Sequence, residues 1–451
     1  MKCLSSGFHP FGLLFLCLCR TLANVNVLSF QFWWSKALPE RIRALVVCGA
    51  AAISLFSSMP RDCLAVQWTI PSLVNADSSP AVPNSGSSTV ATDGQGTWIV
   101  AWSRNSATLI ARSHDFGSSW DGPTTISTTL GARVLYCDGA TWLLFSAANL
   151  NGDTDIEILR STDGGQTWAG PIFVNNDATT DTASDDTPCA VSDGNGSWVA
   201  LWSRQLGSSY TIQMARSTDG GLGWTSPALL ADTPSKVPAI TRYGQTLVAS
   251  FGQGDPDTTQ LKARRSTNFG VNWSAAQTLA TVPGGAMNQF FAGATAIALD
   301  SQANCVAFIN RSDVRIDNRQ ETHLLCVRST DAGASWAPAV EIGNTVISTI
   351  YPPGANPRAL WAPGFGFIKL QTTIGTQLAD LSSFASTDGG ATWPTDGISN
   401  SFIASPDIAV DSSGRAISVW TSTVTLTGRA NVYFSRSNML PSAVSDWMLL
   451  Q

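Results

Sequence analysis

Short stretches in which apolar and polar residues alternate recur along the chain, and helical periodicity is almost absent. Alternation of this kind predicts half-buried strands. One set of stretches ends in Arg-Ser or a similar dipeptide, such as "TLIARS" at 108–113 and "IEILRS" at 156–161. A second set, often rich in Trp, precedes it, as in "TWIVAWSR" at 97–104. A further stretch comes before each pair and another follows, which predicts units of four short antiparallel strands.

After the third strand of each unit the chain repeats one polar phrase that closes on Trp. The six copies are "SHDFGSSW", "STDGGQTW", "STDGGLGW", "STNFGVNW", "STDAGASW" and "STDGGATW", beginning at Ser113, Ser161, Ser217, Ser266, Ser329 and Ser386. A period near fifty residues is typical of repeat architectures, and four strands per period indicate a propeller blade. A seventh three-strand unit follows at 407–437 without a clear copy. We therefore predict an all-β, seven-bladed β-propeller, with six blades and an irregular end as the alternative.

The phrase predicts a turn between the third and fourth strands of each blade. Ser and Asp side chains accept hydrogen bonds from turn N–H groups, and Gly supplies a positive φ angle. Asn replaces Asp in the fourth copy, which favours a structural role that needs no charge. The residues assigned to this role are Asp115, Asp163, Asp219, Asn268, Asp331 and Asp388. Two segments compete to close the ring, namely 67–76 and 446–450.

The first 65 residues differ from the rest of the chain and are expected to be a targeting region. Lys36, Arg41 and Arg43 precede an apolar run from Ala44 to Phe56, and small residues follow up to Ala65. This order is typical of a secretory signal. We expect cleavage after Ala65, a propeller domain at 66–451, and a protein that is secreted, periplasmic or on the cell surface; a membrane anchor is the alternative.

The amino-acid composition argues against several kinds of binding partner and functional site. Apolar residues make up 44% of the chain, charged residues only 13%, and the net charge is −6. The absence of a basic run argues against nucleic acid. Only three histidines are present, which excludes a Ser-His-Asp triad and a multi-histidine zinc site. Cys305 and Cys326 flank one predicted hairpin, so a disulfide and two free thiols both remain open.

The phrase Ser-x-Asp-x-Gly-x-x-Trp resembles the Asp-box, or BNR repeat, of the sialidase superfamily, and the resemblance covers residues 66–451. It implies a propeller and a glycosidase that holds the substrate carboxylate with three arginines. It further implies a Tyr nucleophile primed by Glu and an Asp acid/base. The family's Arg-Ile-Pro signature is absent here, and the chain after residue 65 has only Glu157, Glu321 and Glu341. We therefore expect an altered site.

Candidate site residues are sought in the loops on the face opposite the repeated turns. Five arginines are candidates for binding an anionic substrate, with a solvated rim or pairing with acidic loops as the alternative: Arg104, Arg204, Arg311, Arg133 and Arg358. Arg133 and Arg358 are favoured, because they lie near the start of inner strands, which line the channel. The acidic loop 175–187 supplies Asp185 as a candidate general acid, and the charged loop 310–323 supplies Glu321. A flexible acidic loop and a salt-bridged lid are the alternatives.

The stretch "NGDTDIE" at 151–157 faintly resembles a calcium loop, but a plain hairpin turn is favoured and no metal or cofactor is expected. Two functions remain in view. The first is a secreted, monomeric glycoside hydrolase of sialidase type acting on a glycan. The second is a propeller that binds glycans or a protein without catalysis.

Overall fold

A computed structural model describes residues 67–74, 85–150, 152–255, 258–283, 295–314, 320–347, 358–363, 366–374, 379–398, 403–423 and 430–438. The chain divides into residues 1–61 and 62–451, and all described residues lie in the second unit. The predicted targeting region therefore lies outside the described residues. The described part of the chain contains no helix that is long and apolar enough to cross a membrane.

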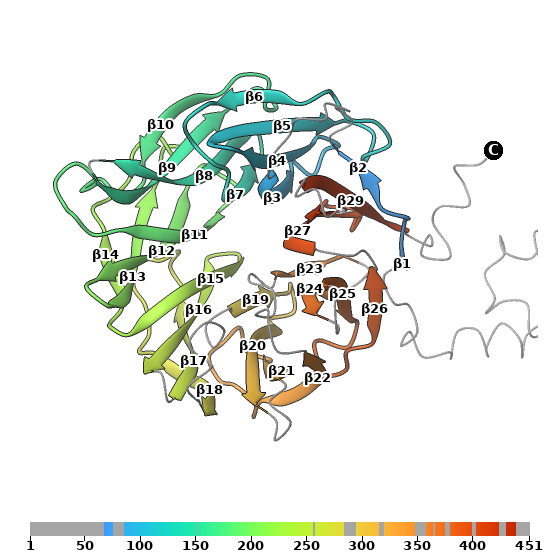
Figure 1. Cartoon of the computed structure of the whole chain (residues 1–451). Coiled ribbons are helices and arrows are strands. Elements are labelled where there is room, and N and C mark those ends of the chain that lie inside the picture. The colour runs from blue at the N-terminus through green and yellow to red at the C-terminus, as the bar shows by residue number, and fades with distance from the viewer. Residues whose placement is uncertain are drawn as a thin grey trace, which may run out of the picture. The chain divides into compact units, whose positions relative to one another are not determined.

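Seven antiparallel sheets follow one another around a ring, each with its first strand at the centre (Figure 1). The first strands are β3 (Ser85–Thr92), β7 (Val134–Asp138), β11 (Asp185–Ser192), β15 (Ser235–Tyr243), β19 (Thr295–Leu299), β23 (Arg358–Ala362) and β27 (Ile403–Val410). The second strands are β4 (Trp98–Arg104), β8 (Thr141–Leu150), β12 (Trp198–Leu206), β16 (Thr246–Asp255), β20 (Cys305–Val314), β24 (Gly366–Ile374) and β28 (Ala416–Thr423).

The outer half of each blade is formed by the third and fourth strands. The third strands are β5 (Ala107–Ser113), β9 (Asp153–Ser161), β13 (Ser209–Ser217), β17 (Thr258–Ser266), β21 (Gln320–Ser329), β25 (Ala379–Ser386) and β29 (Ala430–Asn438). The fourth strands of blades one to six are β6 (Thr124–Ser127), β10 (Ala169–Phe173), β14 (Ala228–Ala231), β18 (Gln277–Pro283), β22 (Val340–Ile347) and β26 (Thr395–Ile398). The all-β fold and the seven blades are confirmed, and the six-bladed alternative is wrong.

The N-terminal strands close the ring. β1 (Gln67–Trp68) and β2 (Ser72–Leu73) pair with successive parts of β29, so the start of the domain supplies the outer edge of the last blade (Figure 1). Such closure leaves that blade no bare outer edge along these residues. The competing segment 446–450 lies outside the described residues.

The apolar cores lie between neighbouring blades, because both faces of each inner strand pair are covered. The second strands contribute the largest buried rings, among them Trp98, Trp142 and Trp198. One such core joins Ile99 of blade one to Trp142 of blade two. The near-continuous apolar runs of the second strands therefore reflect burial on two faces.

The repeated phrase forms the turn between the third and fourth strands. In the second copy, Ser161 donates to Asp163 at 2.8 Å and accepts from Gly165 N, while Asp163 accepts from the N–H of Thr167. Asn268 makes the equivalent contacts in the fourth copy. Hydrogen bonds led by that from the Thr167 hydroxyl lower the pKa of Asp163 to about 2.

The glycine of each phrase also brings its turn against the preceding blade. Gly165 has φ +77°, and a Cβ placed there would lie 2.3 Å from Ile99 Cδ1 of blade one. The same relation joins Gly390 to Val306, the two lying in blades six and five. Each turn is therefore part of an inter-blade contact as well as a local hydrogen-bond motif.

The four described cysteines are free thiols. In the register of β20 and β21, Cys305 lies opposite Ser329 and Cys326 opposite Phe308. The two thiols also belong to different cores, one on each face of blade five. The sequence left a disulfide and two free thiols open for Cys305 and Cys326, and the structure shows two free thiols.

Candidate functional site

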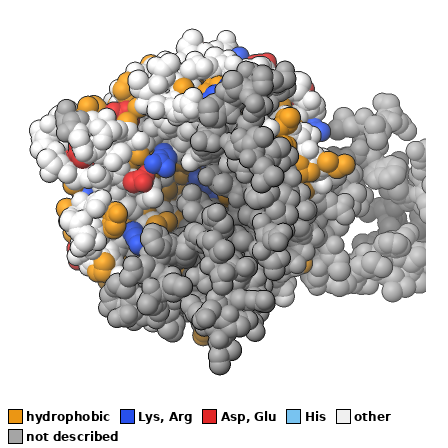
Figure 2. Space-filling model, viewed as in Figure 1, with side chains coloured by type: hydrophobic (Ala, Val, Ile, Leu, Met, Phe, Trp, Pro, Cys, Tyr) orange, Lys and Arg blue, Asp and Glu red, His pale blue; other side chains and the backbone are white. Residues whose placement is uncertain are grey.

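The first strands of all seven blades line one cavity of about 370 Å³ along the axis of the ring. Arg133, Asp186 and Arg358 stand near the beginnings of their strands, whereas the repeated turns lie at the opposite end, next to the strands' last residues. In the space-filling view, a basic and an acidic side chain lie side by side next to a hollow (Figure 2). The cavity therefore has a charged end on the face opposite the turns, where a site was expected.

Arg358 and Asp407 form an ion pair on the cavity wall. Arg358 Nε lies 3.0 Å from Asp407 Oδ1. The second oxygen of Asp407 accepts hydrogen bonds from Thr89 Oγ1 at 2.6 Å and from Val90 N at 3.1 Å. Burial disfavours the charge of Arg358, but Asp407 more than compensates and raises the pKa of the guanidinium. The pair thus joins blades six, seven and one around the channel.

A second, more exposed pair lies between blades two and three. Arg133 Nη2 is 3.5 Å from Asp186 Oδ1, and nearly half of each side chain is exposed. At this distance and exposure the pair contributes little to stability, and a competing anion can displace the carboxylate from Arg133. Arg133 is therefore the more available of the two cavity arginines.

Tyr136 and Cys189 also line the cavity, close enough to Arg358 for its charge to act on both. Burial raises the pKa of the Tyr136 phenol well above its usual value, and it raises the pKa of the Cys189 thiol to about 12. Both groups are therefore protonated at neutral pH. Tyr136 packs edge-on against Phe145, with ring centroids 5.8 Å apart, which holds its ring in place.

Irregular pairing sets the direction of the cavity carboxylates. The pairing of the first and second strands shifts between Asp186 and Cys189, between Lys236 and Ala239, and between Ala404 and Asp407. A proline lies inside each interruption: Pro188, Pro238 and Pro406. Proline cannot donate to a ladder, and a bulge re-aims the side chains beside it.

The structure places Asp185 and Arg204 away from the cavity lining. Arg204 binds Asp185 through Nε and Nη2 and binds Asp177 through Nη1 and Nη2, with all four distances between 2.7 and 2.9 Å. Asp181 lies 2.9 Å from the same guanidinium. Burial raises the pKa of Asp185 to about 6, although Arg204 opposes the shift. Arg204 thus organises the acidic loop that precedes β11.

The remaining candidates lie in second and third strands. Arg104 ends β4 and is not among the residues that line the cavity. The backbones of Arg311 and Glu321 lie in β20 and β21, opposite His323 and Asp313 respectively. Their side chains lie outside the described residues. Of the seven predicted site residues, the structure brings Arg133 and Arg358 together on one cavity.

Sequence reasoning missed Asp407, Tyr136 and the part played by Asp186. Asp186 belongs to the acidic loop 175–187, from which Asp185 is the residue predicted to act as general acid. The two point to different sides because successive side chains of a strand alternate. Pro406, directly before the strand expected from residue 407, was the available signal that Asp407 sits at an irregularity.

Two groups of carboxylates in the described residues are close enough to hold a metal ion. They are Asp153, Asp155 and Asp181, and Asp177, Asp181 and Asp185. The second group already surrounds Arg204. Burial raises the pKa of Asp155 to about 6. Neither group lies on the cavity wall.

No protein-family model and no curated protein matches the chain. Among solved structures, an ulvan lyase bound to GlcA(1-4)Rha3S is similar, with a TM-score of 0.53, 13% identity, and coverage of 81% of this chain and 95% of that one. An α-L-arabinanase of Penicillium chrysogenum has a TM-score of 0.48, 17% identity, and coverage of 82% and 98%. A Hadza microbial sialidase has a TM-score of 0.44, 16% identity, and coverage of 76% of each chain. At such identities the likeness concerns the propeller fold alone.

Proposed function

We propose that the protein binds the acidic end of a carbohydrate at the charged end of its channel. The observation that carries the proposal is the presence of Arg133 and Arg358 on one cavity wall, which Tyr136 also lines. Guanidinium groups bind carboxylate and sulfate through paired hydrogen bonds. Ser87, Ser88 and Thr187 line the same cavity, and hydroxyl groups of this kind suit sugar hydroxyls.

The two ion pairs on the cavity wall favour an anionic ligand over a neutral one. Among the described residues, the ion-pair partner of Arg133 is the exposed carboxylate of Asp186 at 3.5 Å, so an incoming carboxylate or sulfate exchanges with Asp186 at little cost. Arg358 is fixed by Asp407 and offers its outward N–H groups in a set orientation. The ulvan lyase with the same fold binds an acidic, sulfated saccharide, which agrees in kind but adds no argument of its own.

Cleavage of a glycosidic bond by an altered sialidase-type site is the finer proposal. Tyr136 lines the cavity near Arg358, and the charge of Arg358 acts on its phenol. The phenol is protonated, so it is better prepared to donate a proton than to attack. Among the described cavity residues the carboxylates are Asp186 and Asp407, both ion-paired. The catalytic roles of Asp185 and Glu321 stay predictions. A propeller that binds glycans without cleaving them is the alternative.

The test is a binding titration of the full chain with saccharides that differ in one acidic group. We expect binding of a uronic-acid, sialic-acid or sulfated oligosaccharide and none of the matched neutral sugar. Arg133→Gln and Arg358→Gln should weaken binding. Arg112→Gln is the control, because Arg112 pairs with Asp121 outside the cavity. Equal binding of neutral and acidic sugars, or unchanged binding by both cavity variants, would contradict the proposal.

The same saccharides, as fluorogenic glycosides, separate cleavage from binding. Release of the fluorophore from an acidic glycoside supports the hydrolase, whereas binding without release supports the non-catalytic alternative. Secretion and a monomeric state are further proposals, which N-terminal sequencing of the exported protein and its sedimentation would test.

A further inference from the structure

We propose that Asp153, Asp155 and Asp181 bind a calcium ion between β9 and the loop 174–184 that leads into β11. This site is separate from the channel. It joins the third strand of blade two to the segment that enters blade three.

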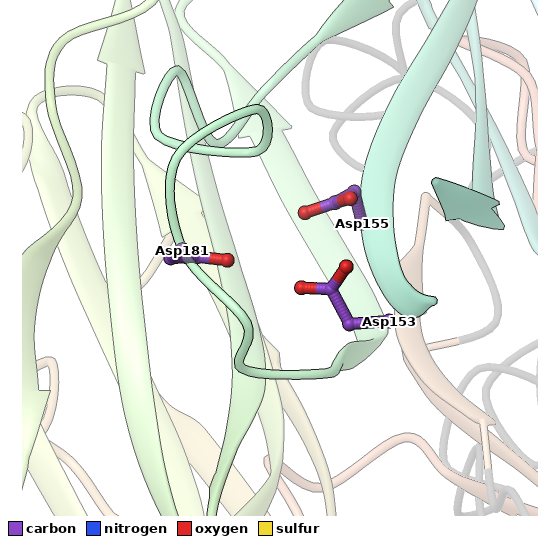
Figure 3. Close-up of side chains that lie close together, drawn as sticks. All are labelled: Asp153, Asp155 and Asp181. Carbon is purple, nitrogen blue, oxygen red and sulfur yellow. The ribbon is translucent and has the colours of Figure 1, made fainter. Parts of the chain in front are cut away.

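The three carboxylates come from two segments that are separated by β10 in the sequence. Asp153 and Asp155 are alternate residues of β9, so both side chains lie on one face of the blade. Asp181 faces them from the loop, and the three carboxylates point into the space between strand and loop (Figure 3). One oxygen of each lies within 4.8 Å of an oxygen of both others. Oxygens at this separation can share one cation.

The buried oxygens of the strand lack protein partners, and this observation is independent of the clustering. Asp155 is fully buried, and Asp153 is 7% exposed. Among the described residues, Asp155 Oδ2 and Asp153 Oδ2 have no hydrogen-bond partner. Glu157, the next residue on the same face of β9, is 5% exposed, and its Oε2 also has none. Buried carboxylate oxygens of this kind need a cation, a proton or a donor.

The local charge balance points to a cation. The group comprises six carboxyl residues, namely Asp153, Asp155, Glu157, Asp177, Asp181 and Asp185. In the part of the chain that the structure describes, Arg204 is the basic residue paired with them. Arg204 directs its bidentate contacts to Asp177 and Asp185. The excess negative charge therefore lies on the side of β9.

One neighbour orients the central ligand. Asn175 Nδ2 donates to Asp155 Oδ1 at 2.7 Å, and Asn175 Oδ1 accepts from Ile156 N at 3.0 Å. Asn175 thereby fixes one oxygen of Asp155 and leaves the other toward Asp153 and Asp181. A carboxylate held by a second residue is typical of metal ligands.

The donor set favours calcium over other common ions. All the candidate ligand atoms are carboxylate oxygens, which suit hard cations, whereas zinc prefers nitrogen and sulfur. Calcium tolerates irregular geometry and completes its shell with water. Asp181 is 20% exposed, so the ion has a route from solvent.

The test is a calorimetric titration of the full chain with CaCl₂ after treatment with EDTA. We expect one binding event for the wild type and its loss in Asp153→Asn and Asp155→Asn. Asp232→Asn removes a charge from an exposed loop residue and should leave binding unchanged. MgCl₂ should bind more weakly.

Thermal unfolding covers the case in which a variant folds poorly. Calcium should raise the Tm of the wild type, and EDTA should reverse the rise. In EDTA, Asp155→Asn should unfold at or above the wild-type Tm, because it removes an unpaired buried charge, yet it should show no response to calcium. Absence of calcium binding by the wild type, or an unchanged response in both Asp153→Asn and Asp155→Asn, would overturn the proposal and leave protons to balance the cluster.

Discussion

Arg358 Nε and Asp407 Oδ1 lie 3.0 Å apart on the wall of the central channel, although the two residues belong to different blades. Asp407 also accepts from Thr89 and Val90 of blade one, so a single carboxylate links three blades. The pair both supports the ring and places a guanidinium where the proposed ligand enters. This double role makes the stabilising and ligand-binding effects separable by mutation.

Asp407→Asn should destabilise the propeller by about 2–4 kcal/mol, because it leaves Arg358 partly buried without its counter-charge and weakens the acceptor of Thr89. The midpoint of urea unfolding measures the effect. Asp232→Asn, at an exposed position, should leave that midpoint where it is. A shift no larger for Asp407→Asn than for this control would show that the pair does not support the ring.

Arg358→Gln and Arg133→Gln should differ in their effects on stability and on ligand affinity. Arg358→Gln should lower both stability and affinity for an acidic saccharide, whereas Arg133→Gln should lower affinity by about 1–2 kcal/mol with little effect on stability. In the double variant Arg358→Gln/Asp407→Asn, stability should recover relative to Arg358→Gln while affinity does not. Recovery of both would mean that Arg358 acts on the ligand only through the fold.

Gly165→Ala should destabilise the protein by more than Gly164→Ala. Both glycines have positive φ, which costs an alanine about 1–2 kcal/mol, but a Cβ at Gly164 meets nothing within 4 Å. A Cβ at Gly165 meets Ile99 Cδ1, which adds about 1–3 kcal/mol of overpacking. Ile99→Val removes that atom, so the double variant should recover part of the loss in chemical unfolding. Additive effects would exclude the inter-blade contact as the cause.

Asp163→Ala should cost about 1 kcal/mol, as loss of a helix cap does, because the N–H groups of Gln166 and Thr167 lose their acceptor. Asp163→Asn should cost less, since Asn268 fills the equivalent position in the fourth copy. Thermal unfolding of the two variants checks the order. Equal losses for Asn and Ala would mean that the charge of the aspartate is what matters.

The repeated turns also predict the response to acid. Hydrogen bonds, led by those from the Ser119 and Thr167 hydroxyls, lower the pKa values of Asp115 and Asp163 to about 2, below the value of 3.8 expected in the unfolded chain. A lowered folded-state pKa contributes stability that is present above about pH 4 and is lost as the pH falls toward 2. The Tm should decline over that window, and Asp163→Asn should make the decline shallower. An unchanged slope in that variant would assign the acid response to other carboxylates.

Much of the fold was accessible from local patterns. Alternation in "IEILRS" and the double-sided apolar run in "TWIVAWSR" each identify a strand without knowledge of its neighbours. Six copies of one turn mark six of the seven blades, and the seventh is indicated only by its three strands. The N-terminal segment 67–76 was one of two candidates for ring closure, and pairing of β1 and β2 with β29 decides for it. Both candidates have strand character, so only the three-dimensional path distinguishes them.

The channel site was less accessible, because its residues come from strands separated by hundreds of positions. Arg133 and Arg358 were expected from their place at the start of inner strands, and the structure puts both on the cavity wall. Asp407 was not predicted, although the adjacent Pro406 indicates an irregular strand, and the prediction of Asp185 did not identify Asp186 as the neighbour that faces the channel. A bulge of one residue exchanges the two sides of a strand, and nothing local in the sequence states the final register.

The sequence by itself determined the strands, their turns and the repeat of about fifty residues, because these depend on side-chain periodicity and on turn chemistry within a few residues. The choice between six and seven blades was left to the structure. Only the tertiary structure decided which charges meet: Arg358 with Asp407, Arg204 with three aspartates, and Asp181 with Asp153 and Asp155. Such partners are chosen by the closure of the ring and the register of its bulged inner strands, which depend on contacts between distant segments.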